Sequence, residues 1–182
     1  MRARVIDAVV TAFDTDPAFR YFFPDETAFA EHAARFTGRL FDERVSRKTV
    51  WVVADGAAVA MWDGPPELSA DPIPAPSVAT ALPPDVTARL ERYDAVVEAA
   101  LPDDPHWYLG VVATHPAYAG RRWGRQLIAA GLERAITDGL PAYLETANPH
   151  NVNLYRSVGW DVTATIGVDG LDIWVMRHPG GT

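Results

Sequence analysis

Five residues, Gly120 to Gly124, combine small backbone positions with two positive charges where a strand gives way to a helix. A β-branched strand is expected over Leu109 to Ala113, followed by a turn containing Pro116, and the sequence GRRWG is expected to form the first turn of an amphipathic helix. A helix N-terminus leaves backbone N–H groups without intrahelical partners and carries partial positive charge. Arg121 and Arg122 add to that charge. The spacing therefore predicts a phosphate or pyrophosphate site, although the glycine motifs of dinucleotide-binding and triphosphate-binding loops are absent.

Two ionisable side chains downstream are suited to acid–base chemistry. Glu145 lies near the end of an expected strand, where open sheets place their ligands, and a carboxylate there could take a proton from an attacking ammonium. Tyr155, with an ordinary pKa of about 10, is suited to act as a proton donor. Two structural alternatives stay open, because Glu145 could pair with Arg156 and Tyr155 could pack on the sheet. Asn148 and Asn151 could orient a substrate or cap a helix.

The turn resembles a signature of a known family. Aligned on Gly124, residues 119–124 are similar to the acetyl-coenzyme A motif of the GNAT N-acetyltransferases, Gln/Arg-x-x-Gly-x-Gly/Ala. Gly124 matches this motif, together with the commonly seen Gly120. Ala119 and Arg122 depart from the residues that are usual at their positions.

The resemblance extends over most of the chain and is strongest from Trp107 to Thr163. The stretch NLYRSVGW matches the family's ending of a tyrosine, three residues, a glycine and an aromatic residue. Together with VWVVADGAAVAMW, HWYLGVVATHP and YLETANPHN, it looks like the puromycin N-acetyltransferase branch. The resemblance implies a GNAT fold and acetyl-coenzyme A as the acyl donor. It also implies that Glu145 serves the acceptor amine and that Tyr155 protonates the departing thiolate.

The resemblance assigns the other site residues as well. The strand edge from Val112 to Thr114 would bind the pantetheine arm, and the turn at 119–124 would bind the pyrophosphate. An aromatic cluster bounded by Pro17 and Pro24 would help to wall the acceptor pocket. The expected cofactor-binding residues are Val112, Ala113, Thr114, Ala119, Gly120, Arg121, Arg122, Trp123, Gly124 and Asn148, and the expected substrate-binding residues are Phe22, Trp62, Trp107 and Asn151.

Hydrophobic periodicity predicts the elements that must position these residues. Asp85 is the expected N-cap of one helix, and Asp55-Gly56 the tight turn of a hairpin. The Pro-rich stretch 64–84 is expected to be a surface loop. Helices are expected at about 3–13, 26–45, 85–101, 120–138 and 149–158, and strands at 49–63 as the hairpin, at 106–113 and 142–146 as a parallel pair, and at 161–178 as a closing antiparallel pair. This pattern predicts a single α/β (α+β) domain over residues 1–182, with a mixed, mostly antiparallel central sheet flanked by helices.

Composition limits the partners that the chain could have. It has 182 residues, a formal net charge of −8 and no cysteine. The negative charge argues against a nucleic-acid partner and suits a cationic amine. With no cysteine and five scattered histidines, no metal site is expected. No apolar run of ~20 residues occurs, so we expect no membrane partner and a cytoplasmic protein, either monomeric or homodimeric.

The sequence thus predicts an N-acetyltransferase that moves an acetyl group from acetyl-coenzyme A to a primary amine of a small molecule by direct attack. The acceptor would be antibiotic-like or aminonucleoside-like. One alternative is a protein acetyltransferase acting on a lysine or an N-terminal amine, which an open groove would favour. Another is a catalytically inert domain that binds acyl-coenzyme A or another ligand, suggested by Ala119 and Arg122. The presence of both Glu145 and Tyr155 argues against the inert domain.

Overall fold

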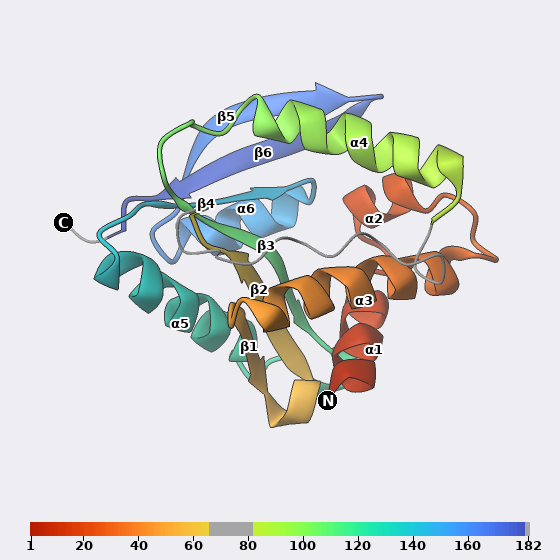
Figure 1. The fold of residues 1–182 in the computed structure, drawn as a ribbon, viewed down its shortest axis with the longest axis horizontal. Coiled ribbons are helices and arrows are strands. Elements are labelled where there is room, and N and C mark those ends of the chain that lie inside the picture. Colours follow the sequence, from red (N-terminus) through yellow and green to blue (C-terminus); the bar gives the residue numbers. More distant parts are fainter. Residues whose placement is uncertain (66–81, 181–182) are drawn as a thin grey trace.

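The computed structural model describes residues 1–65 and 82–180, which form a six-stranded sheet with helices on both faces (Figure 1). The strand order is β1-β2-β3-β4-β6-β5. Only β3 and β4 pair in parallel, and the other neighbouring strands pair antiparallel. The expected mixed, mostly antiparallel sheet flanked by helices is therefore confirmed. The strands are β1 (Val50–Val53), β2 (Ala58–Asp63), β3 (Trp107–Thr114), β4 (Ala142–Thr146), β5 (Asp161–Val168) and β6 (Leu171–His178).

The helices follow the expected periodic segments but differ at some ends. One short helix, α2, forms where the sequence predicts only an aromatic stretch, because Asp16 caps its first turn and Pro17 is already fixed in a helical φ. Another, α4, begins with Pro83 as its N-cap, so Asp85 lies inside the first turn and the predicted cap is wrong. The helices are α1 (Arg2–Ala12), α2 (Pro17–Phe22), α3 (Phe29–Ser46), α4 (Pro84–Glu98), α5 (Trp123–Thr137) and α6 (Pro149–Arg156). Residues 66–81 of the predicted Pro-rich loop lie outside the described residues.

The β1–β2 hairpin forms where it is predicted, but its turn is longer than a two-residue turn. Val53 pairs with Ala58, so residues 54–57 connect the strands. Ala54, Asp55 and Gly56 all have positive φ angles, of 51°, 54° and 93°. Asp55-Gly56 supplies the left-handed backbone, as the sequence predicts, within a short 3₁₀ turn.

The sheet is covered by different helices on its two faces. Helices α1 to α4 pack on one face, in a core that includes Phe19, Phe22, Phe41 and Met61. Helices α5 and α6 pack on the other face, in a second core that includes Trp62. Figure 1 shows α4 running along β5 and β6, and α5 on the side of the sheet away from α1 and α3.

A one-residue irregularity in β3 changes which face its side chains meet. Met61 pairs with Val111, but Trp62 pairs with Leu109, so Gly110 is an extra residue on β3. Val111 therefore packs in the core under α1 to α4, whereas Leu109 packs in the core under α5. The bulge falls where β3 is about to leave its parallel neighbour, and it bends the strand there.

The two parallel strands separate after a short contact. Their register contains only the pairs Trp107 with Ala142 and Tyr108 with Tyr143. Beyond these pairs, β3 continues to Thr114 and β4 to Thr146 without bonding to each other. A sheet edge whose N–H and C=O groups lack a strand partner can bind an extended ligand. The centre of the sheet therefore presents such an edge, although both strands are interior in the strand order.

The contact between Gly131 and Trp62 leaves no room for a side chain. A Cβ added at Gly131 would lie 2.2 Å from Cε2 of Trp62, whose ring is fully buried. We expect Gly131→Ala to lower the free energy of unfolding by about 1–3 kcal/mol in urea denaturation, because a rigid ring cannot move aside. Gly124→Ala in the same helix is the control, since its Cβ would meet Thr114 at an ordinary 3.8 Å. Equal stability of the two variants would contradict this packing.

Candidate active site

A cavity of about 230 Å³ opens at the gap between β3 and β4. Its walls come from both faces of the sheet. They include Phe22 of α2 and Tyr93 of α4 on one side, and Tyr155 of α6 on the other. Val112 of β3 and Glu145 of β4 lie on the two strands that separate. The cavity therefore runs through the sheet, where a ligand can contact a strand edge and side chains of both layers.

Glu145, one predicted catalytic residue, is held at the end of β4 by two tyrosines. The Tyr108 hydroxyl donates a hydrogen bond to its Oε2, and the Tyr93 hydroxyl donates one to its Oε1 at 3.4 Å. Burial raises the pKa of Glu145 to about 7, against the effect of these hydrogen bonds, and the negative charge of Asp94 adds to the rise. A carboxyl group with this pKa can exchange a proton near neutrality. No ion pair with Arg156 forms within the part of the chain that the structure describes.

Tyr155, the other predicted catalytic residue, lines the same cavity. Its side chain is 7% exposed, and its ring packs edge-on against Trp160 with centroids 6.2 Å apart. Its hydroxyl makes no hydrogen bond to any described residue. Burial raises the pKa of Tyr155 well above its ordinary value, and the negative charges of Glu145 and Asp16 raise it further. The hydroxyl therefore stays protonated near neutral pH and is available as a donor to a ligand.

The turn before α5 differs from the prediction in one respect. The helix begins at Trp123, so Gly120 to Arg122 precede it, and the predicted first turn is placed too early. Arg122 is the N-cap residue and has a left-handed backbone with φ 60°, while Gly120 has φ 81°. Glycine adopts such angles freely, whereas they cost arginine free energy.

Despite this difference, the turn offers a run of free backbone donors. The first amide beyond it, that of Gln126, bonds to the Arg122 carbonyl at 3.3 Å. The six N–H groups of residues 120–125 have no acceptor among the described residues. Free amides around left-handed residues at a helix N-terminus form an anion-binding concavity. The Arg121 guanidinium lies over the rings of Tyr118 and Trp123, at 5.5 and 5.2 Å from their centroids.

The open edge of β3 supplies further donors beside the cavity. The His115 N–H bonds to the Ala57 carbonyl at 2.9 Å, so His115 faces β2. Because successive residues of a strand face opposite neighbours, the backbone groups of Thr114 and Val112 face the gap. Those of Ala113 face β2, and its side chain is buried in the core under α1 to α4. Among these three predicted cofactor-binding residues, only Val112 lines the cavity.

Comparison with known proteins identifies the family. The sequence profile of the Acetyltransferase (GNAT) family matches residues 13–160, which is most of the chain. The chain belongs to this family. Because it belongs to this acetyltransferase family, the protein is an acyltransferase, as the sequence predicts. The match does not extend to the puromycin N-acetyltransferase branch, which stays a prediction.

Solved structures of related shape confirm the GNAT fold. A protein described as histone acetyltransferase HPA2 and related acetyltransferase from Corynebacterium glutamicum is 23% identical with a TM-score of 0.68, covering 100% of this chain and 92% of that one. The C-terminal condensation domain of Ebony in complex with β-alanyl-dopamine is 12% identical with a TM-score of 0.69, covering 97% and 92%. An N-acetyltransferase from Staphylococcus aureus Mu50 is 14% identical with a TM-score of 0.57, covering 97% and 94%. At these identities the likeness extends to the fold alone.

The GNAT domain does not bring two predicted substrate-binding residues to the cavity. Trp62 and Trp107 are 0% and 2% exposed, lie in the core under α5 and are not among the residues that line the cavity. The alternation of β2 places Trp62 in this core, and the bulge at Gly110 places Trp107 there, on the face opposite to Val111. The Trp107 indole N–H donates to Asp138 at 3.0 Å, which gives it a structural role. Phe22 and Asn151, by contrast, line the cavity as expected.

Asn148 is a predicted cofactor-binding residue, but its side chain caps a helix, which is the other role that the sequence left open. Its side-chain oxygen accepts the His150 N–H at 3.0 Å and caps α6. It is not among the residues that line the cavity. Its role is therefore to fix the start of the helix that carries Tyr155.

Several polar residues of the cavity escape the sequence analysis. Tyr93 falls on the apolar stripe of α4, and Tyr108 stands next to a buried tryptophan, so both resemble core residues. A tyrosine hydroxyl on a buried face needs a hydrogen-bond partner, and this requirement was the sequence signal that could have identified Tyr93 and Tyr108. Asp16 could have been found from the Asp-Pro pair that starts a helix. In residues 1–65 and 82–180 we find no cluster of histidine and acidic side chains that could hold a metal, and no helix long and apolar enough to span a bilayer.

Proposed function

We propose that the protein transfers the acetyl group of acetyl-coenzyme A to a primary amine of a small molecule. One observation carries this proposal: the cavity at the open strand edge holds both a carboxylate with a pKa near neutrality, Glu145, and a protonated hydroxyl with no hydrogen-bond partner among the described residues, Tyr155. One group can receive a proton and the other can give one. Acyl transfer from a thioester to an ammonium requires both of these steps.

The chemistry follows from where the protons must go. The acceptor arrives as an ammonium, and Glu145 takes one proton so that the nitrogen can attack the thioester carbonyl. The strand N–H groups of Val112 and Thr114 that face the gap can stabilise the developing oxyanion. The C–N bond forms, the C–S bond breaks, and Tyr155 gives its proton to the sulfur; the second proton of the nitrogen then returns Tyr155 to its protonated form, and the proton on Glu145 is released to solvent. The products are the amide, the free thiol and one released proton.

The donor fits the elements at the other end of the gap. The six free amides of residues 120–125, next to Arg121 and Arg122, can hold the pyrophosphate. The unpaired edge of β3 can bond the amide groups of the pantetheine arm as a neighbouring strand would. The turn follows the C-terminal end of this edge, and Glu145 lies near the point where β3 and β4 begin to separate, so the extended arm would lead along β3 from the anion site toward Glu145.

The small-molecule acceptor is favoured over a protein by the shape of the site. The acceptor side of the cavity is walled by residues of α2, α3 and α4, including Phe22, Phe36 and Tyr93. A lysine side chain or an N-terminus would need an open groove. An inert domain would not need the Glu145 and Tyr155 pair.

This proposal is tested by measuring thiol release with a panel of amines. The protein has no cysteine, so a thiol reagent reports only coenzyme A released from the donor. We expect thiol release with a small primary amine, and mass spectrometry to identify its N-acetyl product. Turnover of a lysine peptide in preference to every small amine would overturn the choice of acceptor. Thioester hydrolysis with no amide product would overturn the reaction.

The pyrophosphate assignment leads to a separate prediction for Arg122. We expect Arg122→Gly to weaken acetyl-coenzyme A binding about five- to tenfold, because it removes a charge-assisted contact. The same variant should be slightly more stable to heat, since glycine accepts the positive φ. Titration calorimetry gives the first quantity and thermal unfolding the second. S-acetylpantetheine, which lacks the pyrophosphate, is the control and should bind both proteins equally. Equal or tighter binding of acetyl-coenzyme A would show that the arginine merely obstructs the turn.

A further inference from the structure

Asp16 places a second carboxylate in the cavity, on the acceptor side. It precedes α2, and its Oδ1 accepts the N–H groups of Ala18 and Phe19 at 2.9 and 3.2 Å. Its other oxygen has no hydrogen bond and no ion pair within the described residues. Burial raises the pKa of Asp16 above its ordinary value, and the two capping amides oppose this rise. Asp16 is half-buried, and a half-buried carboxylate with a free oxygen is stabilised by a cation placed beside it.

Among residues 1–65 and 82–180, no charged side chain around the cavity acts as a counterion to Asp16. Three acidic side chains line it, namely Asp16, Asp94 and Glu145. Arg44 also lines the cavity, but it is paired with Asp63. Arg39 pairs with Glu43 at 3.8 Å and lowers the pKa of Asp94 by its charge. The arginines of the lining are therefore matched by other carboxylates, and a ligand must supply the positive charge for Asp16.

Asp16 is also close to the reacting groups. Its negative charge raises the pKa of both Tyr93 and Tyr155, as the charge of Glu145 does. Tyr155 is 7% exposed and lines the same cavity, and its hydroxyl makes no hydrogen bond to the described residues. An amine positioned to attack next to Tyr155 would therefore lie within the field of Asp16 and Glu145 together.

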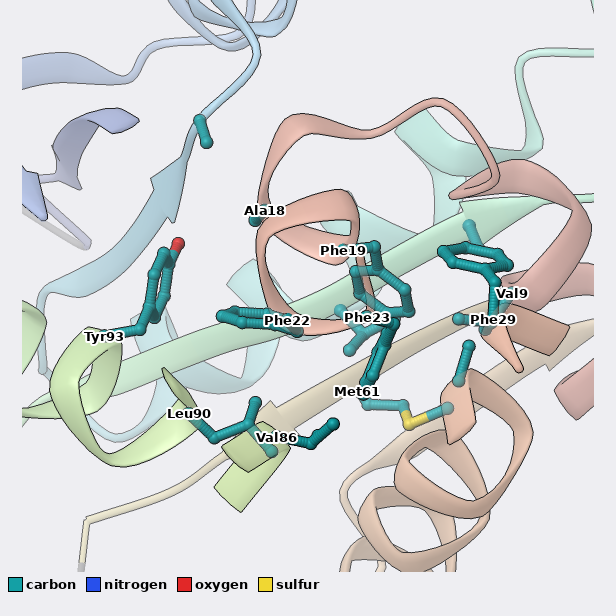
Figure 2. Packing of buried hydrophobic residues seen from close by; sticks show 14 of the residues in the cluster. Val9, Ala18, Phe19, Phe22, Phe23, Phe29, Met61, Val86, Leu90 and Tyr93 are labelled. Carbon is teal, nitrogen blue, oxygen red and sulfur yellow. The ribbon is translucent and has the colours of Figure 1, made fainter. Parts of the chain in front are cut away.

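Aromatic rings form the rest of the acceptor side. Phe22 contacts Tyr93 edge-on with centroids 4.8 Å apart and lies 6.1 Å from Phe19. Figure 2 shows Phe22 between Tyr93 and the pair formed by Phe19 and Phe23. Phe13 and Phe36 also line the cavity. Such rings accept a flat apolar body.

The size of the cavity limits the acceptor further. Its volume of about 230 Å³ is below the ~300–1,000 Å³ of pockets that hold drug-sized ligands. The acetyl end of the donor must share this space, because Val112 and Tyr155 line the same cavity. A bulky nucleoside or aminoglycoside does not fit the remaining room.

We propose that Asp16 anchors the ammonium group of the acceptor, and that the acceptor is a compact primary amine with a single positive charge and an apolar body about the size of one ring. This inference rests on the proposed function and adds the class of its acceptor. Asp16 holds the cation while Glu145 removes the proton, so Asp16 determines specificity and does not take part in proton transfer. A dication would leave its second charge against the phenylalanine rings.

The test uses 2-phenylethylamine as acceptor and the variant Asp16→Asn. Asparagine caps a helix as well as aspartate does, so the substitution removes the charge and keeps the fold. We expect the KM for 2-phenylethylamine to rise at least tenfold, with the KM for acetyl-coenzyme A unchanged. Inhibition by 2-phenylethanol, which has the same body without the charge, should also stay unchanged. Asp16→Ser, which keeps a capping oxygen, should behave in the same way.

Asp14→Asn is the matched control, because Asp14 is 58% exposed and paired with Arg20 on the surface. It should leave every constant at its wild-type value. An unchanged KM in Asp16→Asn, or an equal rise in Asp14→Asn, would overturn the anchor. A higher kcat/KM for putrescine or puromycin than for 2-phenylethylamine would overturn the acceptor class and leave acetyl transfer intact.

Direct calorimetric titration of 2-phenylethylamine separates this inference from the proposed function, because it needs no turnover. We expect binding to wild type that is at least tenfold weaker in Asp16→Asn. Absence of binding at millimolar amine, with acetyl-coenzyme A either present or absent, would overturn the anchor even if other amines are acetylated. Binding that depends on Asp16 in a protein that cannot transfer acetyl would instead overturn only the proposed function.

Discussion

Replacing Glu145 by glutamine is expected to slow acetyl transfer by about 100-fold or more, the usual effect of losing a general base. Glutamine has nearly the same shape as glutamate: its oxygen can accept from one of the two tyrosine hydroxyls, Tyr108 or Tyr93, and its amide N–H can donate to the other hydroxyl oxygen. Steady-state kinetics with 2-phenylethylamine would measure the effect. The affinity for acetyl-coenzyme A should not change. A rate within twofold of wild type would remove Glu145 from the mechanism.

The same variant is expected to lose a pH dependence. Glu145 must be ionised to take a proton, and its pKa is about 7. The wild-type kcat/KM should therefore rise as pH increases through about 7 and level off above it, while the acceptor stays an ammonium up to its own pKa of about 10. Glu145→Gln should show no inflection near pH 7. An identical inflection in both proteins would assign the titration to another group.

We expect the stability of the wild type to fall over the pH range in which its activity rises. The folded-state pKa of Glu145, about 7, lies above the ordinary value of 4.5. Between these pH values the folded chain keeps a proton that the unfolded chain has lost, so the free energy of unfolding of the wild type falls as pH rises through this range. Glutamine cannot ionise and escapes this loss. Relative to the difference at pH 4, Glu145→Gln should gain up to about 3 kcal/mol at pH 8. Parallel stability curves from pH 4 to 8 would contradict the raised pKa.

Tyr155→Phe is the second substitution with a large expected effect. Phenylalanine keeps the ring that packs against Trp160 and removes only the hydroxyl, so we expect turnover to fall more than tenfold while acetyl-coenzyme A affinity is spared. The reason is that the thiolate would leave without a proton donor. Thiol-release kinetics and calorimetry would measure the two quantities.

The matched control for that substitution is Tyr143→Phe. Tyr143 is also buried, at 9% exposed, and lies on β4, but it does not line the cavity. Its substitution should leave turnover close to wild type. An unchanged rate in Tyr155→Phe, or equal losses in both variants, would show that the Tyr155 hydroxyl is not the acid.

Local patterns explain why so much of the fold is predictable from the sequence. The strand before Gly120, the helix after it and the strand carrying Glu145 each have their own periodicity, and together they require a parallel pair crossed by a helix. Asp55-Gly56 predicts the β1–β2 hairpin in the same way. These signals lie within a few residues of the elements that they define.

The polar contacts of the site are not predictable in this way because they join distant segments. Glu145 meets Tyr93 and Tyr108, which lie 52 and 37 residues away along the chain. The face on which Trp107 lies depends on a bulge at Gly110, which has no signal other than the glycine itself. The left-handed backbone of Arg122 opposes the preference of arginine, so the sequence places the start of α5 too early. Sequence periodicity therefore predicts the framework, and tertiary contacts decide the site.

Calorimetric titration of the purified protein with acetyl-coenzyme A tests the central claim most directly. The free amides of residues 120–125 and the open edge of β3 are the features on which donor binding depends. We expect saturable binding with a Kd in the micromolar range, and weaker binding of S-acetylpantetheine, which lacks the pyrophosphate. No detectable binding up to millimolar acetyl-coenzyme A would contradict the account, because the turn before α5 would then not be a donor site.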